Sequence, residues 1–494
     1  MTIRTLSAIF FLFYGLSIPI AAQDFMLQNV VASVAMMISC FIIALLLWSG
    51  RALLLNLIIA YQVLRIYLIR PYVDIFLPEL NGTQINHINS INSFYSSSDA
   101  ATVYLSLLSL LFAWFVGLHI SQSIQTKSVC LPKIFRQVGG IVSKGGLEFW
   151  LVWVILTVLN YKPATDLYQG ISTGESSPLF AFGLLSTFTI SLICFFTYLR
   201  SKSREGGKAS FLLLFPVLYT TIEGSMNGSR SALFVFVIYG LIYWLCLNFN
   251  RRIDRRDIKR IIFMFLLFPI VIFTGLIAQL LRPILQYSND SKAVAEALWQ
   301  GLDISNPNNP LFNTIYFGLT ELLHRLSSLK AQFYIMNDRF IHEPWEMYNP
   351  IETLMRIIND LLPGELFTDI LTINKLFDYI YLDNLVTYNS EMWSIQGSLY
   401  LYFGFWLSPI VVFIFAFMIS RYRHAISFLA KSSPAYAVLF ILAFNGLLEN
   451  GTLERVIPVN VVRPLVSIFV IVFMVRVMRS FILKLQRLLS QKKQ

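Results

Sequence analysis

The chain has 494 residues, of which 56% are hydrophobic and 13% are charged, and its net charge is +11. Soluble domains have about 25% charged residues, so this composition excludes an ordinary soluble protein and indicates a polytopic membrane protein. Most Lys and Arg residues lie in short segments between apolar runs, as the positive-inside rule describes for cytoplasmic loops. The positive charge is therefore a sign of topology, and we exclude nucleic acid as a partner.

Apolar runs approaching the roughly 20 residues that a spanning helix needs recur along the whole chain. We predict an all-α polytopic membrane protein with about 12 transmembrane helices. The runs are Ile3–Ala21, Val30–Trp48, Ala52–Ile69, Ala101–Ile120, Leu147–Tyr161, Pro178–Leu199, Ser210–Ile222, Ser231–Phe249, Ile261–Leu281, Leu401–Ile419, Pro434–Leu448 and Pro464–Met478. The first run also resembles a signal peptide, but it has no A-x-A cleavage site, so we expect it to remain as a helix.

The third run ends at Arg70-Pro71, where proline stops the helix. The polar segment Pro71–Ser98, which contains no Lys or Arg, then follows as a predicted external loop. Arg65 lies within a turn or two of that surface. An arginine in such a position more often snorkels toward water than binds a ligand.

The orientation of the chain rests on the stretch Thr221–Leu233, TIEGSMNGSRSAL, which is a polar break between two apolar runs. The far ends of those runs carry the basic clusters RSKSREGGK, from Arg200, and RRIDRRDIKR, from Arg251. The positive-inside rule places both clusters in the cytoplasm. The turn Gly224–Ser229 is therefore predicted to be extracytoplasmic, and both termini of the chain to be cytoplasmic.

Four parts follow from this orientation. Residues 1–281 hold transmembrane helices 1–9 with the central polar turn, residues 282–392 form an external amphipathic helical segment, residues 393–480 hold helices 10–12, and residues 481–494 form a basic cytoplasmic tail. In the external segment we predict helices over Thr314–Met336 and over IETLMRIINDLL, which follows Asn349-Pro350. These helices are equally consistent with two roles: a cover over a cavity, or a packed lid that takes no part in catalysis.

The motifs of soluble enzymes are absent from the sequence. It contains no Walker loop, no GxGxxG after a strand, no GxSxG and no HExxH. The first external loop also has no DxD-like acidic pair that could hold a divalent metal. We therefore expect a site that uses neither a metal nor another cofactor.

Arg230 is the strongest candidate for a binding residue. It opens the eighth apolar run, where the N-terminus of a helix favours an anion. A guanidinium at that position, with Ser229 or Ser231 as the cap, suits phosphate oxygens in a bidentate arrangement. Further basic residues of the outer segments are Arg282, His324, Arg325 and Arg455. Each of these residues also fits interfacial snorkelling, but the GSR context on a mostly acidic outer face favours Arg230.

Two motifs together resemble a known family. MNGSRSAL at Met226, the long polar segment after it, and GSLYLYFG at Gly397 resemble the O-antigen or oligosaccharide repeat-unit polymerases of the Wzy type. In similar proteins the second motif often reads GE-x-Y-x-N-F-G. Here Ser398 stands in the place of the acid and Tyr402 in the place of the asparagine. Glu391, just upstream, is a candidate to supply the carboxylate instead.

The resemblance implies a metal-independent, GT-C-like glycosyltransferase in the bacterial inner membrane. Such an enzyme moves a growing glycan from its polyprenyl diphosphate donor to a lipid-linked acceptor, and works beside a chain-length regulator and a flippase. Fixed arginines would stabilise the departing diphosphate, and a base would activate the attacking hydroxyl. The implied catalytic residues are Arg230, Arg282, Glu223, Glu321 and His324, and the implied substrate-binding residues are Ser229, Arg325, Arg455 and Glu391.

The sequence also fits two other functions. A flippase or another transporter would place charged groups on broken helices near the bilayer midplane and would show paired repeats. In this sequence the middle of each run is almost free of charge, and no such repeat is visible. An O-antigen ligase would use the same donor and differ only in its acceptor, which the sequence does not reveal.

Overall fold

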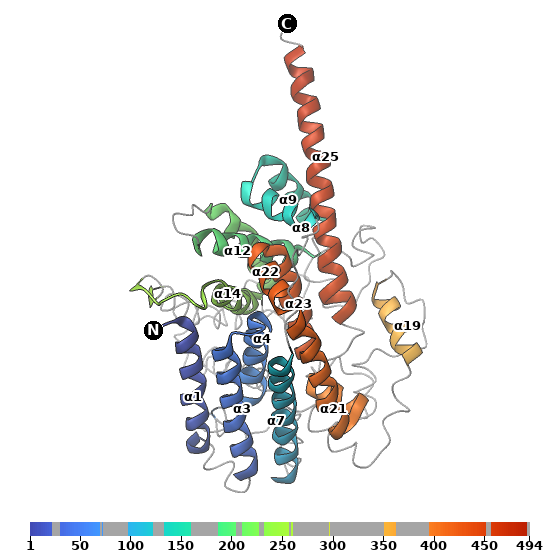
Figure 1. Ribbon diagram of the computed structural model, residues 1–494. Helices are drawn as coiled ribbons and strands as arrows, with labels where there is room; N and C mark the ends of the chain where they lie inside the picture. The colour runs from blue at the N-terminus through green and yellow to red at the C-terminus, as the bar shows by residue number, and fades with distance from the viewer. Residues whose placement is uncertain are drawn as a thin grey trace.

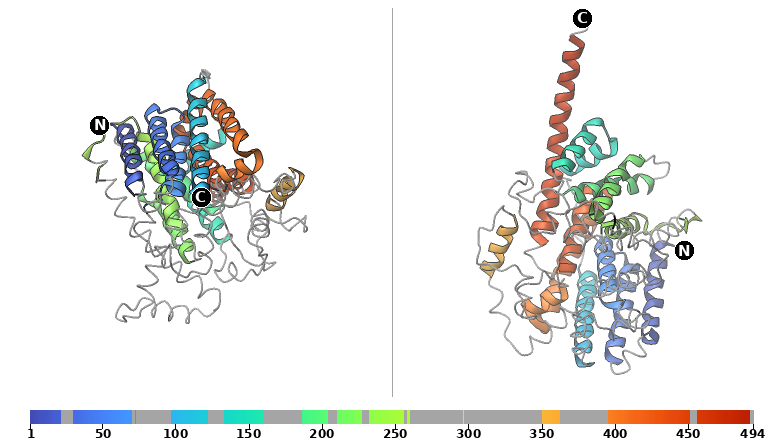
Figure 2. Two further views of the ribbon diagram at one scale, coloured as in Figure 1. Left: turned by 90° about the horizontal axis from the view of Figure 1, so that it is seen from below. Right: turned by 180° about the vertical axis from the view of Figure 1, so that it is seen from behind.

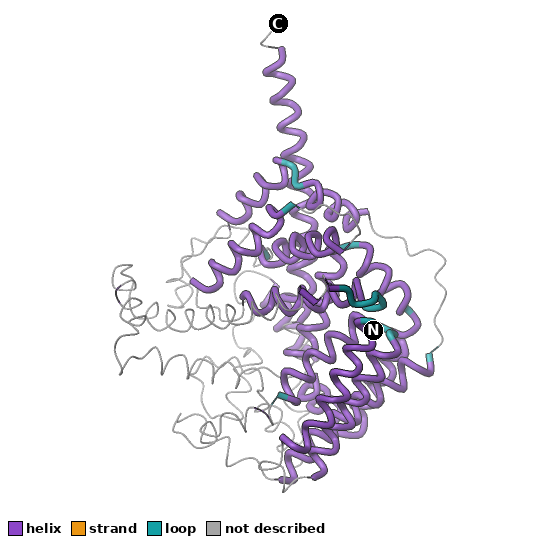
Figure 3. Tube along the Cα trace, turned by 90° about the vertical axis from the view of Figure 1, so that its left-hand side faces the viewer, coloured by secondary structure: helices purple, strands orange, loops and turns teal. Residues whose placement is uncertain are grey.

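The computed structural model describes residues 1–21, 30–69, 72, 97–121, 133–159, 186–203, 210–226, 232–255, 258–259, 296, 350–361, 395–450 and 456–491. Within these ranges the chain forms helices and no strand, as Figure 3 shows. A single isolated bridge, between Thr2 and Arg252, is the extent of β pairing in these ranges. The predicted all-α class is therefore confirmed for the described part of the chain.

Four long helices pack side by side in the lower part of Figure 1. They are α1 (Ile3–Ala21), α3 (Val30–Ser49), α7 (Ser97–Ile120) and α21 (Ile395–Arg421). Small residues allow the closest approaches. A Cβ added to Gly117 of α7 would stand 2.7 Å from the carbonyl oxygen of Phe413 in α21, and one added to Gly15 of α1 would stand 2.8 Å from the Cβ of Cys40 in α3.

A second group of helices surrounds α23 (Pro434–Asn450). The helix α4 (Leu53–Val63) continues directly into the π-helical turn η1 (Leu64–Leu68) and packs along α23. The helices α12 (Thr187–Ser203) and α14 (Ala232–Asn248) cross above them in Figure 1. A second π-helical segment, η5 (Val456–Val462), also packs against α23.

The remaining helices surround these two groups or extend beyond them. They are α8 (Lys133–Lys144), α9 (Leu147–Leu159), the 3₁₀ turn η3 (Phe211–Leu214), α13 (Phe215–Met226), α19 (Pro350–Leu361), α22 (Arg423–Ser432) and α25 (Arg463–Gln491). A bend of 100° separates α8 from α9. The end of α25 projects beyond all other described helices in Figures 1 and 2.

Apolar side chains cover much of the outer surface of these helices. Trp406 of α21 is 82% exposed and Phe473 of α25 is 68% exposed, and many Leu, Ile and Val side chains share this exposure. Such a surface would promote aggregation in water, whereas a bilayer accommodates it. Five described helices are long and apolar enough to cross a membrane, or six if α8 and α9 form one bent span.

The predicted runs compare well with the described helices. Eleven of them overlap described helices, although several of these helices are short and the first part of the run Pro178–Leu199 is not described. The run Ile261–Leu281 lies outside the described residues. A count of twelve spanning helices is therefore not established. The helix predicted after Asn349 is confirmed, because α19 begins at Pro350. The other helix predicted in the external segment, Thr314–Met336, lies outside the described residues.

Candidate functional site

Most of the predicted site residues lie outside the residues that the structure describes. These residues are Ser229, Arg230, Arg282, Glu321, His324, Arg325, Glu391 and Arg455. Their roles stay predictions. Glu223 is described: it lies in α13, one residue beyond the apolar run Ser210–Ile222, and burial raises the pKa of its carboxyl. A raised pKa brings a carboxylate closer to the range of an effective general base.

The GSLYLYFG motif forms the first turns of α21 and ends at a break in that helix. Gly404, the last residue of the motif, has φ 73° and ψ 179°, a backbone conformation that essentially only glycine adopts. Ser408 bridges the break, because its Oγ lies within hydrogen-bond distance of the carbonyl oxygens of Leu399, at 2.9 Å, and of Gly404, which share its single O–H donor. Ser398 is buried, and its Oγ has no hydrogen-bond partner among the described residues.

A buried ion pair joins two helices that are far apart in the sequence. Arg65 of η1 and Glu449 of α23 approach to 2.7 Å between Nη1 and Oε1, and their side chains are only 14% and 17% exposed. Arg65 also donates a hydrogen bond to the hydroxyl of Tyr61. The expectation that Arg65 snorkels toward water is therefore wrong, because an acidic partner holds it between the helices.

Asn445 connects this ion pair to a third helix. Its Nδ2 donates to Oε2 of Glu449 at 3.0 Å and to the hydroxyl of Tyr239, in α14, at 2.7 Å. Its Oδ1 accepts a hydrogen bond of 2.6 Å from Nε2 of Gln62, in α4. We call Tyr61, Gln62, Arg65, Tyr239, Asn445 and Glu449 the interhelical polar network.

Local backbone structure positions the network. A π-helical turn shifts the side chains that follow it relative to a regular α-helix, and such turns are frequent at functional sites. Arg65 lies in one such turn, η1, and Asn460 lies in the other, η5. A Cβ added to Gly446 would stand 2.5 Å from Cγ of Asn460. Glycine at 446 therefore lets η5 approach α23 one residue from Asn445.

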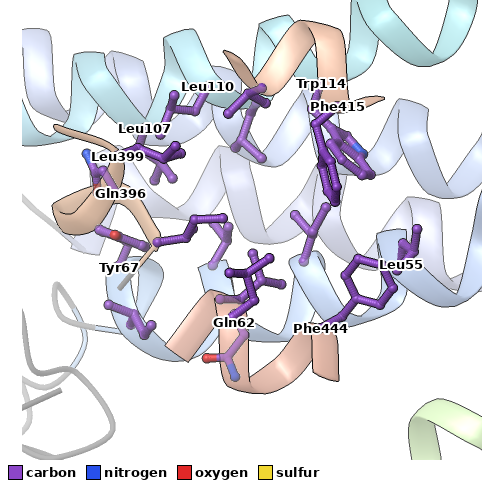
Figure 4. A pocket seen from close by; sticks show the side chains of 18 residues that line it. Leu55, Gln62, Tyr67, Leu107, Leu110, Trp114, Gln396, Leu399, Phe415 and Phe444 are labelled. Atoms are coloured by element: carbon purple, nitrogen blue, oxygen red, sulfur yellow. The ribbon is translucent and has the colours of Figure 1, made fainter. Parts of the chain in front are cut away.

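An apolar cavity of about 100 Å³ lies beside the network, between α4, η1, α7, α21 and α23. Figure 4 shows Trp114 and Phe415 at one end of it and Tyr67 and Gln396 at the other. Gln62 belongs to both features, because it lines the cavity and hydrogen-bonds Asn445. The polar network and the cavity therefore share a wall.

The sequence carries one signal for this site, which is an arginine inside an apolar run. An ionisable residue within a membrane helix is a functional candidate by default, and Arg65 met that description. The partner was not apparent, because Glu449 lies hundreds of residues later, at the end of another apolar run. Two charged residues at equivalent ends of two runs are the pattern that indicates such a pair.

The network offers the chemistry of a recognition site. A guanidinium held by a carboxylate can hydrogen-bond an anionic group with its remaining N–H groups, and the neighbouring cavity offers only apolar contacts along most of its wall. Together they suit a ligand with a polar head and a hydrocarbon chain. The sequence matches no family model, no curated protein and no solved structure, so the resemblance carried by the two motifs stays a prediction.

Proposed function

We propose that the protein is a glycan polymerase that joins polyprenyl-diphosphate-linked oligosaccharide repeat units on the outer face of the bacterial inner membrane. The observation that carries this proposal is the order of MNGSRSAL, a long polar segment and GSLYLYFG in one chain of apolar helices. The break in α21 at Gly404 adds support, because the last residue of the second motif has a backbone conformation that essentially only glycine adopts. A polar network beside an apolar cavity also suits an amphiphilic substrate.

The proposed topology has about 12 spanning helices, cytoplasmic termini, and external segments at Pro71–Ser98 and 282–392. Contacts between helix ends support it. The Thr2–Arg252 bridge joins two ends that the charge rule assigns to the cytoplasm. Two further pairs of cytoplasmic ends are joined by the hydrogen bonds from Arg51 to the carbonyl oxygens of Leu118 and His119, at 3.2 Å, and from Ser203 to Asn248, at 2.9 Å.

Ends assigned to the outer face are also joined to one another. Arg65 and Glu449 close the outer ends of α4 and α23. The backbone N–H of Ser186, before α12, donates to Oγ of Ser467, near the start of α25, at 2.8 Å. These contacts agree with helices that alternate in direction as the basic loops require.

The reaction transfers a glycosyl group. The bond between the anomeric carbon of the donor glycan and its phosphate oxygen breaks, and that carbon forms a bond to a hydroxyl oxygen of the acceptor sugar. The hydroxyl proton passes to a base, for which Glu223, Glu321, His324 and Glu391 are the candidates. The diphosphate leaves with the bonding electrons, and Arg230 and Arg282 would stabilise its charge.

A lipid-linked oligosaccharide flippase is the second candidate, and one observation favours it. The Arg65–Glu449 pair lies beside two π-helical segments, and buried charges on interrupted helices are typical of transporters. An O-antigen ligase shares the donor chemistry of the polymerase. The three functions differ in what happens to the glycan: it becomes longer, it crosses the bilayer, or it is attached to a different acceptor.

The test uses the purified protein in liposomes that contain a lipid-diphosphate-linked repeat unit, with EDTA and without sugar nucleotide or ATP. A polymerase produces a ladder of longer lipid-linked glycans, which gel electrophoresis resolves. A flippase leaves the glycan length unchanged and moves a fluorescent repeat unit to a leaflet where a membrane-impermeant reductant cannot reach it. Absence of the ladder, together with such movement, would replace the polymerase with the flippase.

A further inference from the structure

The interhelical polar network and the apolar cavity meet at Gln62, and this junction has the two halves of an amphiphile-binding site. We propose that Arg65 binds the diphosphate of one lipid-linked substrate, and that the cavity receives the isoprenoid unit next to that diphosphate. This inference rests on the proposed function, because it takes the substrate class from there. It adds a binding site at residues that neither sequence motif contains.

Arg65 has an unused hydrogen-bond donor. Its Nη1 contacts Glu449 and its side chain also bonds Tyr61, but its buried Nε has no partner in the described part of the chain. Buried donors without an acceptor are rare in folded proteins. A phosphate oxygen would supply the acceptor that Nε lacks, and a charge-assisted hydrogen bond of this kind is stronger than a neutral one.

Glu449 acts as a positioning residue in this arrangement. Its Oε1 contacts Arg65, while its Oε2 accepts from Asn445, which Gln62 and Tyr239 hold in place. The carboxylate therefore fixes the guanidinium and balances its charge when no substrate is bound. It also repels an incoming anion, so a glutamine at 449, which loses the charge but still offers Arg65 an acceptor, is expected to strengthen diphosphate binding. A purely structural ion pair would not show that effect.

The cavity supplies the apolar half. Its lining is almost entirely hydrocarbon and aromatic, and such cavities stay dry and accept apolar ligands. Phe415, which lines it, is also 39% exposed on the outer surface of α21, so this side chain separates the cavity from the surface that we assign to lipid. Its volume of about 100 Å³ is below that of the ~150 Å³ cavity known to hold benzene. It therefore suits a single branched isoprene unit rather than a whole chain.

The reaction itself calls for a second diphosphate site. The donor and the acceptor are both linked to polyprenyl diphosphate, so two diphosphates are bound when the new glycosidic bond forms. Arg230 and Arg282 are the candidates for the leaving diphosphate of the donor. The junction at Arg65 offers a separate place for one of the two lipids, between helices that the described hydrogen bonds hold together.

The experiment measures the affinity of the purified full-length protein for undecaprenyl diphosphate, with undecaprenol and inorganic pyrophosphate as the other probes. We expect Arg65→Met, combined with Glu449→Leu, to bind the diphosphate lipid at least tenfold more weakly and undecaprenol unchanged. Glu449→Gln should bind the diphosphate lipid more tightly than the wild type. Leu111→Trp, which fills the cavity, should weaken binding of both lipids.

The matched control is Arg251→Met. Arg251 pairs with Asp254 at 2.8 Å but is 37% exposed and lies on the face assigned to the cytoplasm, so its loss should leave lipid binding unchanged. Wild-type affinity of the Arg65→Met, Glu449→Leu double variant for the diphosphate lipid would overturn the inference. If pyrophosphate binds as tightly as the diphosphate lipid, the cavity does not receive the isoprenoid unit, and that part of the inference is overturned.

Failure of this site and failure of the polymerase can be told apart. A wild-type protein that binds the diphosphate lipid through Arg65 but makes no polymer supports the site and removes the polymerase. A double variant that binds and polymerises like the wild type removes the site and keeps the polymerase. Arg65→Lys adds a check that needs no loss of charge: it should fold normally and bind more weakly, because lysine cannot replace Nε and Nη1 together.

Discussion

Gln62 donates a 2.6 Å hydrogen bond from its Nε2 to Oδ1 of Asn445, although 383 residues separate them in the sequence. Three residues after Gln62 comes Arg65, and four residues after Asn445 comes Glu449, and these two residues also pair. The two contacts fix α4 and α23 as parallel neighbours in one register. The register in turn gives the polar network its geometry.

The side chain of Asn445, in α23, hydrogen-bonds residues of α4 and α14. Replacing it should therefore destabilise the helix bundle. Asn445→Ala leaves Gln62 and the hydroxyl of Tyr239 without their partner, and a buried polar group left unpaired costs about 1–3 kcal/mol. We expect a lower midpoint of thermal unfolding in detergent. Asn250→Ala is the control, because Asn250 is exposed, and it should unfold like the wild type. An unchanged midpoint for Asn445→Ala would show that the network adds little stability.

Single and double neutralisation of the ion pair should differ in their effect on protein abundance. Arg65→Met or Glu449→Leu alone leaves one buried charge without its counterion, which costs about 3–5 kcal/mol. Both changes together remove both charges, and replacing a buried pair by apolar residues is often neutral. Abundance in the membrane should therefore fall in each single variant and recover in the double variant. Equal abundance in all three variants would mean that water or lipid headgroups solvate these charges.

Replacing Gly446 with a larger residue should lower the stability of the protein. A Cβ at this position would stand 2.5 Å from Cγ of Asn460, and overpacking of this kind costs about 1–3 kcal/mol. Gly446→Ala should therefore lower thermal stability, and Asn460→Ala in the same chain should restore part of it. Gly140→Ala provides the matched control, because no atom lies within 4 Å of a Cβ added there in α8. If Gly446→Ala lowers thermal stability and Asn460→Ala does not restore it, the added Cβ clashes with an atom other than those of the Asn460 side chain.

Helices were the predictable part of this fold. Long apolar runs specify helices because a bilayer leaves backbone groups no other partner, and α1 matches the predicted run Ile3–Ala21 at both ends. The pairing of those helices was not predictable in the same way. Charged residues at the ends of two apolar runs mark Arg65 and Glu449 as candidates for a pair. An apolar run shows that a helix lies in the bilayer, but it does not identify the neighbour of that helix.

The proposed topology makes a labelling prediction. A cysteine introduced singly in Pro71–Ser98 or in residues 282–392 should react with a membrane-impermeant maleimide in intact cells, because we assign both segments to the outer face. The native Cys40, Cys194 and Cys246 are buried, and Cys130 can be replaced by serine to keep the background low. A cysteine in the basic segment after Arg251 should react only after the cells are lysed. Protection of residues 282–392 in intact cells would reverse the orientation.

Arg230 carries the sharpest prediction about catalysis. We hypothesise that its guanidinium binds the leaving diphosphate through two N–H donors. Arg230→Lys keeps the charge but loses the planar fork, so it should lose most of the activity. Arg230→Ala removes the donors, and losing one fixed donor at an oxyanion site costs about 10²–10³ in rate.

The readout is the length distribution of the surface glycan, measured together with the amount of protein in the membrane. Both variants should be present at wild-type levels, because an arginine at the interface contributes little to insertion. A snorkelling arginine predicts the opposite pattern: Arg230→Lys would be fully active, and Arg230→Ala would be active or merely less abundant. Full activity of Arg230→Ala at normal abundance would remove Arg230 from the site and leave Arg65 as the arginine to test against the diphosphate.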